Sequence, residues 1–241
     1  MKYSIITSSY NQKEKLERLA YFLAGFENVD FEWIIADDGS SDGTQKWVQE
    51  TFLNHPLGGN MVKLCTQKHD GYGLVSILNK AGEIAEGDYL LWIMADTYPT
   101  EDFFENFDPV VKEDRMVCGV RLNVNEKGLL VGPDWRLVEY PVDANLQEVE
   151  ITFEKPWGLM TLNGMCISKK IWNQMGGIFE GYRGYGKMDW DMAAWCFYHD
   201  LKMVWATRAF LKHDQHEDRE DTPENTELFN KRLKLMQEGK L

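Results

Sequence analysis

Short apolar segments alternate with amphipathic ones along the first hundred residues. Four segments have the length and the apolar, partly β-branched composition of buried strands, namely residues 3–7, 31–36, 62–66 and 89–94. Three segments between them place apolar side chains three or four positions apart, as on one face of a helix, namely residues 11–24, 44–53 and 72–86. This alternation predicts βαβ units and an α/β fold with a mostly parallel central sheet flanked by helices.

The second half of the chain has a less regular pattern. We expect strands at residues 117–124, 128–138 and 203–210, with a turn at 125–128. We expect helices at residues 101–107, 169–175 and 189–199, and in the basic tail 228–241. Residues 213–227 carry seven acids and one arginine, which indicates a solvated loop. Without a linker or a repeat, the prediction is one domain over 1–241, made of halves 1–110 and 111–241.

Charge and composition narrow the classes of partner and the compartment. The chain has 241 residues and a formal net charge of −13, which disfavours nucleic acids and anionic membranes as partners. No apolar run approaches the roughly 18 residues of a transmembrane helix, and the N-terminus is too short and polar for a signal peptide. Four cysteines without a CxxC pair predict free thiols. We therefore expect a cytoplasmic protein.

Polar clusters follow three of the predicted strands directly. They occupy residues 8–11 (SSYN), 37–44 (DDGSSDGT) and 96–99 (DTYP). Ligands of open parallel sheets bind beyond the carboxyl ends of the strands, so we expect these clusters to meet at one site. A tight turn and a helix cap account for the glycines and for Ser41 or Asp42, but two adjacent carboxylates repel each other unless something compensates. The pair Asp37 and Asp38 therefore indicates a functional site.

The order of these elements resembles glycosyltransferase family 2, which has the GT-A fold. The resemblance rests on SSYN after the first strand, DDGSSDGT after the second, GYG before a helix, and an acid after the strand at 89–94. It covers residues 3–110 and continues more weakly to residue 216. The resemblance implies that Ser8, Tyr10 and Asp38 bind the uridine of a UDP-sugar donor.

The resemblance also implies a site for a divalent cation. The Asp-x-Asp of the family falls on Met94, Ala95 and Asp96. Asp96 is therefore the expected ligand of Mn²⁺ or Mg²⁺, and it is expected to bind the donor through this metal. A histidine completes the site in relatives; His213 is the better match and His216 the second choice. Methionine in place of the first carboxylate leaves the affinity and identity of the metal open. The structural alternative makes Asp96 a cap or turn residue before the helix at 101–107.

Residues 176–191 alternate glycines with aromatic residues and end in acids that enter a helix. This segment resembles the acceptor segment of family 2 and of the β-1,4-galactosyltransferase and polypeptide N-acetylgalactosaminyltransferase relatives. The resemblance implies that Asp189 is the catalytic base and that Met188 replaces a glutamate that often contacts the acceptor. It further implies acceptor contacts by Trp157, Asn163, Tyr185, Gly186, Trp190 and Asp191. The structural alternative makes Asp189 a helix cap and the aromatic residues, Trp157 included, part of the core.

These residues predict an inverting, metal-dependent glycosyltransferase that moves a hexose or N-acetylhexosamine from a UDP-sugar to a hydroxyl of a glycan or another acceptor. Residues 213–227 are expected to close over the donor and exclude water. Two alternatives stay open. Met94 and Met188 each remove a carboxylate, as in a GT-A protein that binds nucleotide sugars without turnover. A nucleotidyltransferase is the other alternative, although its glycine-rich basic loop is missing near the N-terminus. The acceptor is not identified by the sequence.

Overall fold

The computed structural model describes residues 2–52, 55–57, 60–125, 127–140, 143, 145–216 and 219–241. The strands are β1 (Tyr3–Ser9), β2 (Phe31–Asp37), β3 (Met61–Thr66), β4 (Tyr89–Trp92), β5 (Thr97–Pro99), β6 (Arg115–Val124), β7 (Leu130–Pro133), β8 (Glu148–Glu150), β9 (Met165–Ser168) and β10 (Lys202–Asp214). The helices are α1 (Lys13–Ala24), α2 (Thr44–Phe52), α3 (Leu74–Ile84), α4 (Phe103–Phe107), α5 (Trp135–Glu139), α6 (Lys169–Met175), α7 (Met188–Tyr198) and α8 (Pro223–Gln237), with a 3₁₀ turn at Pro156–Leu159.

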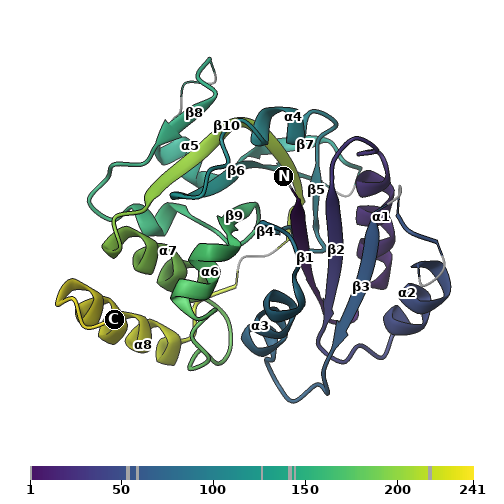
Figure 1. The fold of residues 1–241 in the computed structure, drawn as a ribbon, viewed down its shortest axis with the longest axis horizontal. Coiled ribbons are helices and arrows are strands. Elements are labelled where there is room, and N and C mark those ends of the chain that lie inside the picture. The colour runs from purple at the N-terminus through teal and green to yellow at the C-terminus, as the bar shows by residue number, and fades with distance from the viewer. Residues whose placement is uncertain are drawn as a thin grey trace.

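The first half of the chain forms the parallel part of the sheet, as predicted (Figure 1). β1 lies between β2 and β4 and runs parallel to both, and β3 runs parallel to β2 on the other side. Ser9 at the end of β1 pairs with Asp37 at the end of β2, so these strands end at the same level. The sheet order β3-β2-β1-β4 therefore brings the polar clusters after β1, β2 and β4 to one edge.

The second half adds antiparallel strands, so the sheet is mixed. β9 lies between β4 and β6 and is antiparallel to both. β10 runs parallel to β6, while β5 and β8 pair with β10 in the antiparallel sense. The sequence analysis did not predict β5, β8 or β9, because segments of three or four residues are too short to show a period of two.

Two expectations for the second half are wrong. The strand predicted at 128–138 is β7 followed by α5, because the Asp134 side chain accepts the backbone N–H of Arg136 (3.0 Å) and starts a helix. Of the loop predicted at 213–227, residues 213–214 belong to β10 and residues 223–227 to α8, whose first residue is proline. Residues 217 and 218 of that loop, residue 126 of the turn and residue 53 of the second helix lie outside the described residues.

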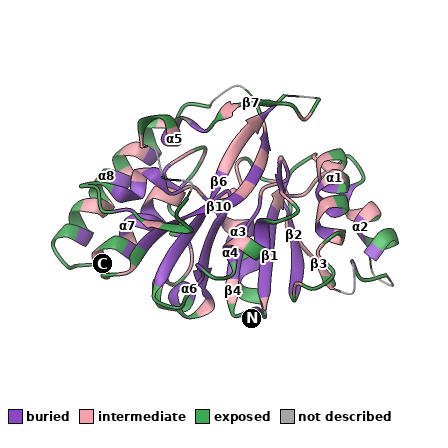
Figure 2. Cartoon of the chain, turned by 90° about the horizontal axis from the view of Figure 1, so that it is seen from above, coloured by how far each residue is buried: buried purple, intermediate pink, exposed green. Residues whose placement is uncertain are grey.

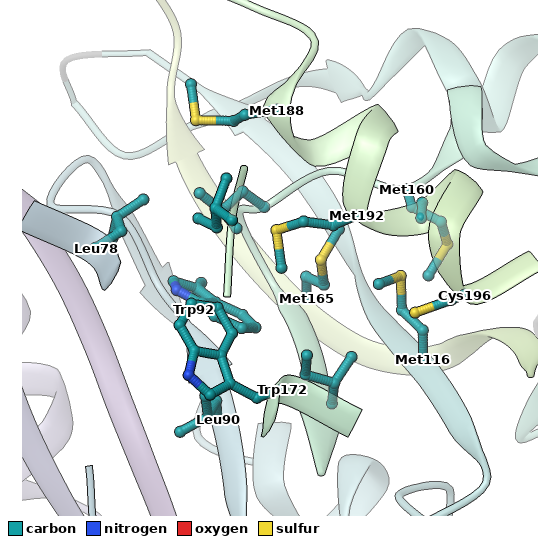
Figure 3. Close-up of a cluster of buried hydrophobic side chains, with 14 of the residues drawn as sticks. Leu78, Leu90, Trp92, Met116, Met160, Met165, Trp172, Met188, Met192 and Cys196 are labelled. Atoms are coloured by element: carbon teal, nitrogen blue, oxygen red, sulfur yellow. The ribbon is translucent and has the colours of Figure 1, made fainter. Parts of the chain in front are cut away.

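Apolar side chains cover both faces of the sheet, so its central strands are buried, while exposed residues lie mainly on helices and loops (Figure 2). One core cluster joins the sheet to α3, α6 and α7, and is rich in methionine and tryptophan (Figure 3). The other joins it to α1, α2 and α4. The four cysteines are free thiols, as predicted, and three of them are buried. The sheet edge that carries the polar clusters thus rests on a packed core.

None of the described helices is both long enough and apolar enough to cross a lipid bilayer.

Candidate active site

The two adjacent aspartates at the end of β2 differ in the hydrogen bonds that their carboxylates accept. Asp37 is fully buried and accepts the backbone N–H of Ser40 (3.1 Å), the Ser40 hydroxyl and the amide of Gln45 (2.8 Å). Its donors all belong to the turn and helix that follow β2. Asp37 therefore holds the turn 37–44 together, which is the structural role that the sequence also allowed.

Asp38 points instead to the loop between β3 and α3. Its carboxylate accepts the amide of Gln67 (2.6 Å) and the backbone N–H of Gly73 (3.2 Å), and lies 3.0 Å from Nδ1 of His69. A Cβ at Gly73 would collide with this carboxylate, so the close approach requires glycine. The sequence analysis missed Gln67 and His69. Only their place just before the GYG motif could have suggested them.

An aromatic surface lies beside Asp38. The rings of Tyr10 and His69 stack with centroids 3.9 Å apart and an interplanar angle of 12°. Tyr10 is 44% exposed, so the stack borders solvent at the sheet edge. The Ser8 hydroxyl donates to the sulfur of Met94 (3.2 Å), which occupies the position of the missing carboxylate. The residues predicted to bind uridine, Ser8, Tyr10 and Asp38, thus lie at the ends of two neighbouring strands.

Asp96 and both candidate histidines form one group. Each of Asp96, His213 and His216 offers a ligand atom, and these atoms lie within 4.8 Å of one another. His213 pairs across the sheet with Thr97, the neighbour of Asp96, and the backbone N–H of Asp214 donates to the Asp96 carbonyl (2.9 Å). The structural alternative for Asp96 is wrong for the helix cap, because the N-cap of α4 is Asp102, but Asp96 does lie in a turn, between β4 and β5. The group has the composition of a metal site with two imidazoles and one carboxylate.

The surroundings keep this group in the protonation state that a metal needs. Nδ1 of His213 lies 3.1 Å from Oδ1 of Asn123, and a proton on Nδ1 leaves Nε2 free to bind a metal. Burial and the positive charge of Arg121 lower the pKa of His213 to about 4, so the ring is neutral at pH 7. Burial alone would raise the pKa of Asp96, but His216, whose Nε2 lies 3.6 Å from Oδ2 of Asp96, holds it below its usual value together with the nearby His213 and Lys15.

Asp189 lies in the first turn of α7 and not at its cap. The N-cap is Lys187, with a left-handed φ of 69°, and the Asp189 carboxylate accepts the backbone N–H of Trp190 (3.0 Å). Burial raises the pKa of Asp189, an effect only partly offset by the Trp190 N–H and the charge of Arg136. A carboxylate with a raised pKa binds a proton more readily than an exposed one, which suits a general base.

Two tyrosines lie within electrostatic range of Asp189. Tyr185 is 38% exposed, and burial together with the negative charges of Asp189 and Asp221 raises its pKa. Tyr72 precedes Gly73 and α3, and its pKa is raised to about 12 by burial, by Tyr185 and by Asp189. The Asp38 loop and Asp189 therefore lie within electrostatic range of the same side chains.

A buried network of two arginines and one aspartate, which the sequence analysis missed, joins β6 to the start of α5. Asp134 is 1% exposed and accepts Nε of Arg121 (2.6 Å) as well as Nε and Nη2 of Arg136 (2.7 and 2.9 Å). These arginines hold the pKa of Asp134 well below its usual value despite burial. Arg121 acts electrostatically on His213, and Arg136 on Asp189.

Four residues predicted to contact an acceptor have structural partners instead. Asp191 is 3% exposed and accepts Nε of Arg232 (2.7 Å), and Trp157 packs against Phe197 and Tyr198. Asn163 accepts the backbone N–H of Met94 (3.2 Å) and donates to Thr97, and the Lys187 ammonium lies 3.4 Å from the ring centroid of Trp190. Acceptor contacts by these four residues stay a prediction, and the geometry does not favour it. Tyr185 is accessible to an acceptor.

Comparisons with known proteins identify the family of the chain. A sequence model of the family described as Glycosyl transferase family 2 matches residues 4–170, which is more than half of the chain. The chain is 29% identical to the uncharacterized glycosyltransferase YfnE of Bacillus subtilis over 140 residues, 57% of this chain and 31% of YfnE. It is also 29% identical to the chondroitin synthase of Escherichia coli over 137 residues, 55% of this chain and 19% of that protein.

The fold is that of GT-A proteins of known structure. A crystal structure of S. aureus TarS, residues 1–349, superposes with a TM-score of 0.74 at 16% identity, covering 98% of this chain and 65% of TarS. The TarS complex with UDP-GlcNAc superposes with a TM-score of 0.72 at 17% identity. The chain spans about a third and a fifth of the two curated relatives that it matches. None of these comparisons tests the resemblance of residues 176–191 to galactosyltransferases, which stays a prediction.

Proposed function

The chain belongs to glycosyl transferase family 2, and we propose that it transfers a hexose or an N-acetylhexosamine from a UDP-sugar to an acceptor hydroxyl with inversion. One observation carries the proposal: the Asp38 loop and the group formed by Asp96, His213 and His216 lie at the carboxyl edge of one sheet. The TarS structures with UDP and with UDP-GlcNAc support a uridine donor, since TarS has the same fold. The nucleotidyltransferase alternative is set aside, because the family is one of glycosyltransferases.

The uridine end of the donor is assigned to the ends of β1 and β2. Tyr10, stacked on His69, offers a flat face to a base, and Ser8 and Asp38 offer hydrogen-bonding groups beside it. His69, Gln67 and Gly73 hold the Asp38 carboxylate in place before a ligand arrives. Binding energy from this part of the donor, which does not react, places the anomeric carbon near the base.

The residues present fit a divalent cation. Asp96, His213 and His216 would hold it, with ligand atoms already within 4.8 Å of one another. Imidazole ligands suit transition metals better than Mg²⁺, so we propose Mn²⁺ as the preferred ion, narrowing the choice that the carboxylate alone left open. When bound, the cation supplies positive charge beside the diphosphate leaving group.

Asp189 is assigned as the general base. It removes the proton of the acceptor hydroxyl as that oxygen forms a bond to the anomeric carbon, and the bond from this carbon to the diphosphate breaks on the opposite face. UDP leaves with the bonding electron pair, and the proton stays on Asp189 until solvent takes it. The raised pKa of Asp189 favours this transfer. Tyr185, close to Asp189 and accessible, is the acceptor contact that the geometry supports best.

The test is UDP release from a panel of UDP-sugars, with Mn²⁺ and after chelation. We expect one sugar to give turnover that chelation abolishes and that His213→Ala removes. Removing a residue that hydrogen-bonds to a metal ligand lowers the affinity for the metal about 10- to 100-fold, so we expect removal of a ligand itself to lower this affinity at least as much. Calorimetric titration of Mn²⁺ in the presence of UDP measures this directly for His213→Ala and Asp96→Asn.

The matched control is His199→Ala, which removes an exposed histidine at the end of α7. It is expected to keep both Mn²⁺ binding and turnover. Equal loss in both histidine variants, or wild-type Mn²⁺ affinity in His213→Ala, would contradict the assignment of the metal. Binding of UDP with no turnover of any UDP-sugar would favour the second candidate, a nucleotide-sugar-binding protein without catalysis, which the replacement of carboxylates by Met94 and Met188 motivates.

A further inference from the structure

We propose that the C-terminal helix α8 holds the acceptor loop, residues 182–187, in its catalytic shape, and that Asn225 is the positioning residue. This inference rests on the proposed function, because it assigns α8 a part in catalysis by Asp189. Figure 1 shows α8 beside α7 at the end of the molecule that is far from β3. α8 lies beyond the residues matched by the family model, so the family match says nothing about it.

Asn225 bonds to four consecutive residues of the acceptor loop. Its Oδ1 accepts the backbone N–H of Arg183 (3.1 Å), and its Nδ2 lies within 3.3, 3.3 and 3.0 Å of the carbonyl oxygens of Gly184, Tyr185 and Gly186. The side chain is 1% exposed. A primary amide has two N–H groups and a carbonyl oxygen with two lone pairs, so the loop uses both N–H groups and one of the lone pairs of this side chain.

The loop depends on this contact for its shape. Gly184 and Gly186 have φ values of +83° and +94°, in the region that favours glycine. A Cβ at Gly184 would lie 2.8 Å from Cγ2 of Thr222, and one at Gly186 would overlap the Asp221 carboxylate. The backbone N–H of Thr222 also donates to the Tyr185 carbonyl (3.0 Å). The glycines that suggested a sugar site therefore also let the N-terminus of α8 come this close.

Further contacts with α8 and with the two residues before it flank Asp189 on both sides. Before it, Lys187 forms an ion pair with Asp221 (2.7 Å). After it, Asp191 accepts Nε of Arg232 (2.7 Å), whose guanidinium also lies over the ring of Phe179 at 3.9 Å from its centroid. The Asp189 carboxylate accepts the backbone N–H of Trp190, the next residue of its own helix. Its position in the site is thus set by the loop and the first turn of α7, both of which rest on α8.

The expected effect separates positioning from donor binding. A displacement of about 1 Å of a catalytic group can cost about 100-fold in rate. Ser8 bonds to Met94, Asp38 bonds to residues 67–73, and Tyr10 stacks on His69, so we expect UDP binding not to depend on α8. Loss of the Asn225 amide should therefore lower kcat for UDP release and leave the Kd for UDP unchanged.

The test compares Asn225→Ala, Asn225→Asp and a control, Asn230→Ala, which changes an exposed asparagine of the same helix. The aspartate keeps the size and one acceptor oxygen but cannot donate to the three carbonyls. We expect kcat to fall about 10- to 100-fold in both Asn225 variants, with the Kd for UDP within about twofold of wild type and Asn230→Ala unchanged. Wild-type kcat in a folded Asn225 variant, or an equal loss of UDP affinity, would overturn the proposal.

Hydrogen exchange of the backbone amides gives a second readout that does not depend on catalysis. The amides of Arg183 and Thr222 should lose protection in Asn225→Asp, while those of β1 and β2 keep it. Unchanged protection at both positions would overturn the inference. If the wild-type protein turned over no UDP-sugar, the proposed function would be wrong. Hydrogen exchange alone would then test whether Asn225 holds the loop in place.

Discussion

Asp189→Asn should lower UDP-sugar turnover by about 10²- to 10⁴-fold while the Kd for UDP stays at the wild-type value. Positioned general bases contribute rate factors of this size, and the amide cannot accept the acceptor proton. Asparagine has almost the same shape, so packing around the first turn of α7 should persist. Steady-state kinetics of UDP release, together with calorimetric titration of UDP, measure both quantities.

The matched control is Asp200→Asn, just beyond the end of α7. Asp200 is exposed and has a φ of 57°, which asparagine tolerates well, so turnover should not change. The pH profile adds a second check. The pKa of Asp189 is raised above its usual value of 3.8. As the pH decreases, wild-type turnover should therefore begin to fall at a higher pH than the one at which an exposed aspartate becomes protonated. Full turnover in Asp189→Asn would remove this residue from the mechanism.

Asp134→Asn should lower the free energy of unfolding by about 3–5 kcal/mol, the usual effect of removing one partner of a buried ion pair. The substitution leaves Arg136, which is 4% exposed, and Arg121 without a counter-charge. Chemical denaturation monitored by tryptophan fluorescence measures the change. Asp114→Asn is the control: its carboxylate also faces an arginine, at 3.5 Å, but is 66% exposed, so the expected loss is about 0–1 kcal/mol.

The pH dependence of this stability has a definite sign. The pKa of Asp134 is lower in the folded protein than its usual value of 3.8, so its contribution to the free energy of unfolding is complete above that value. It is lost as the pH falls below about 4 toward the folded pKa. The difference in stability between wild type and Asp134→Asn should therefore narrow on acidification. A constant difference from pH 7 to pH 3 would contradict the buried ion-pair account.

The fold was predictable from the sequence where elements are long and periodic. β1 to β4 and α1 to α3 follow alternating apolar segments, and their order alone places SSYN, DDGSSDGT and Asp96 at one edge. The same reasoning missed β5, β8 and β9, because three or four residues carry no readable period. It also extended a strand through Asp134, whose capping of α5 depends on a side-chain bond that patterning does not reveal.

The candidate site was predictable at strand ends and poorly predictable on α7. Asp96 and His213 followed from the resemblance, and the structure adds His216 to the same group. The apolar residues of α7 surround the helix, so periodicity could not separate an accessible position from a buried one such as Asp191. The bonds of Asp191 and Asn225 span about 40 residues of chain, and no local motif indicates contacts of that kind.

Titration of UDP tests the central claim most directly. The claim is that the edge formed by Ser8, Tyr10, Asp38 and Asp96 is a uridine diphosphate site. Calorimetry with wild-type protein and Mn²⁺ should show UDP binding with a stoichiometry of one, with ADP and GDP binding at least about tenfold more weakly, a difference of about 1.4 kcal/mol. The absence of UDP binding with and without Mn²⁺, or equal affinity for all three nucleotides, would contradict the account.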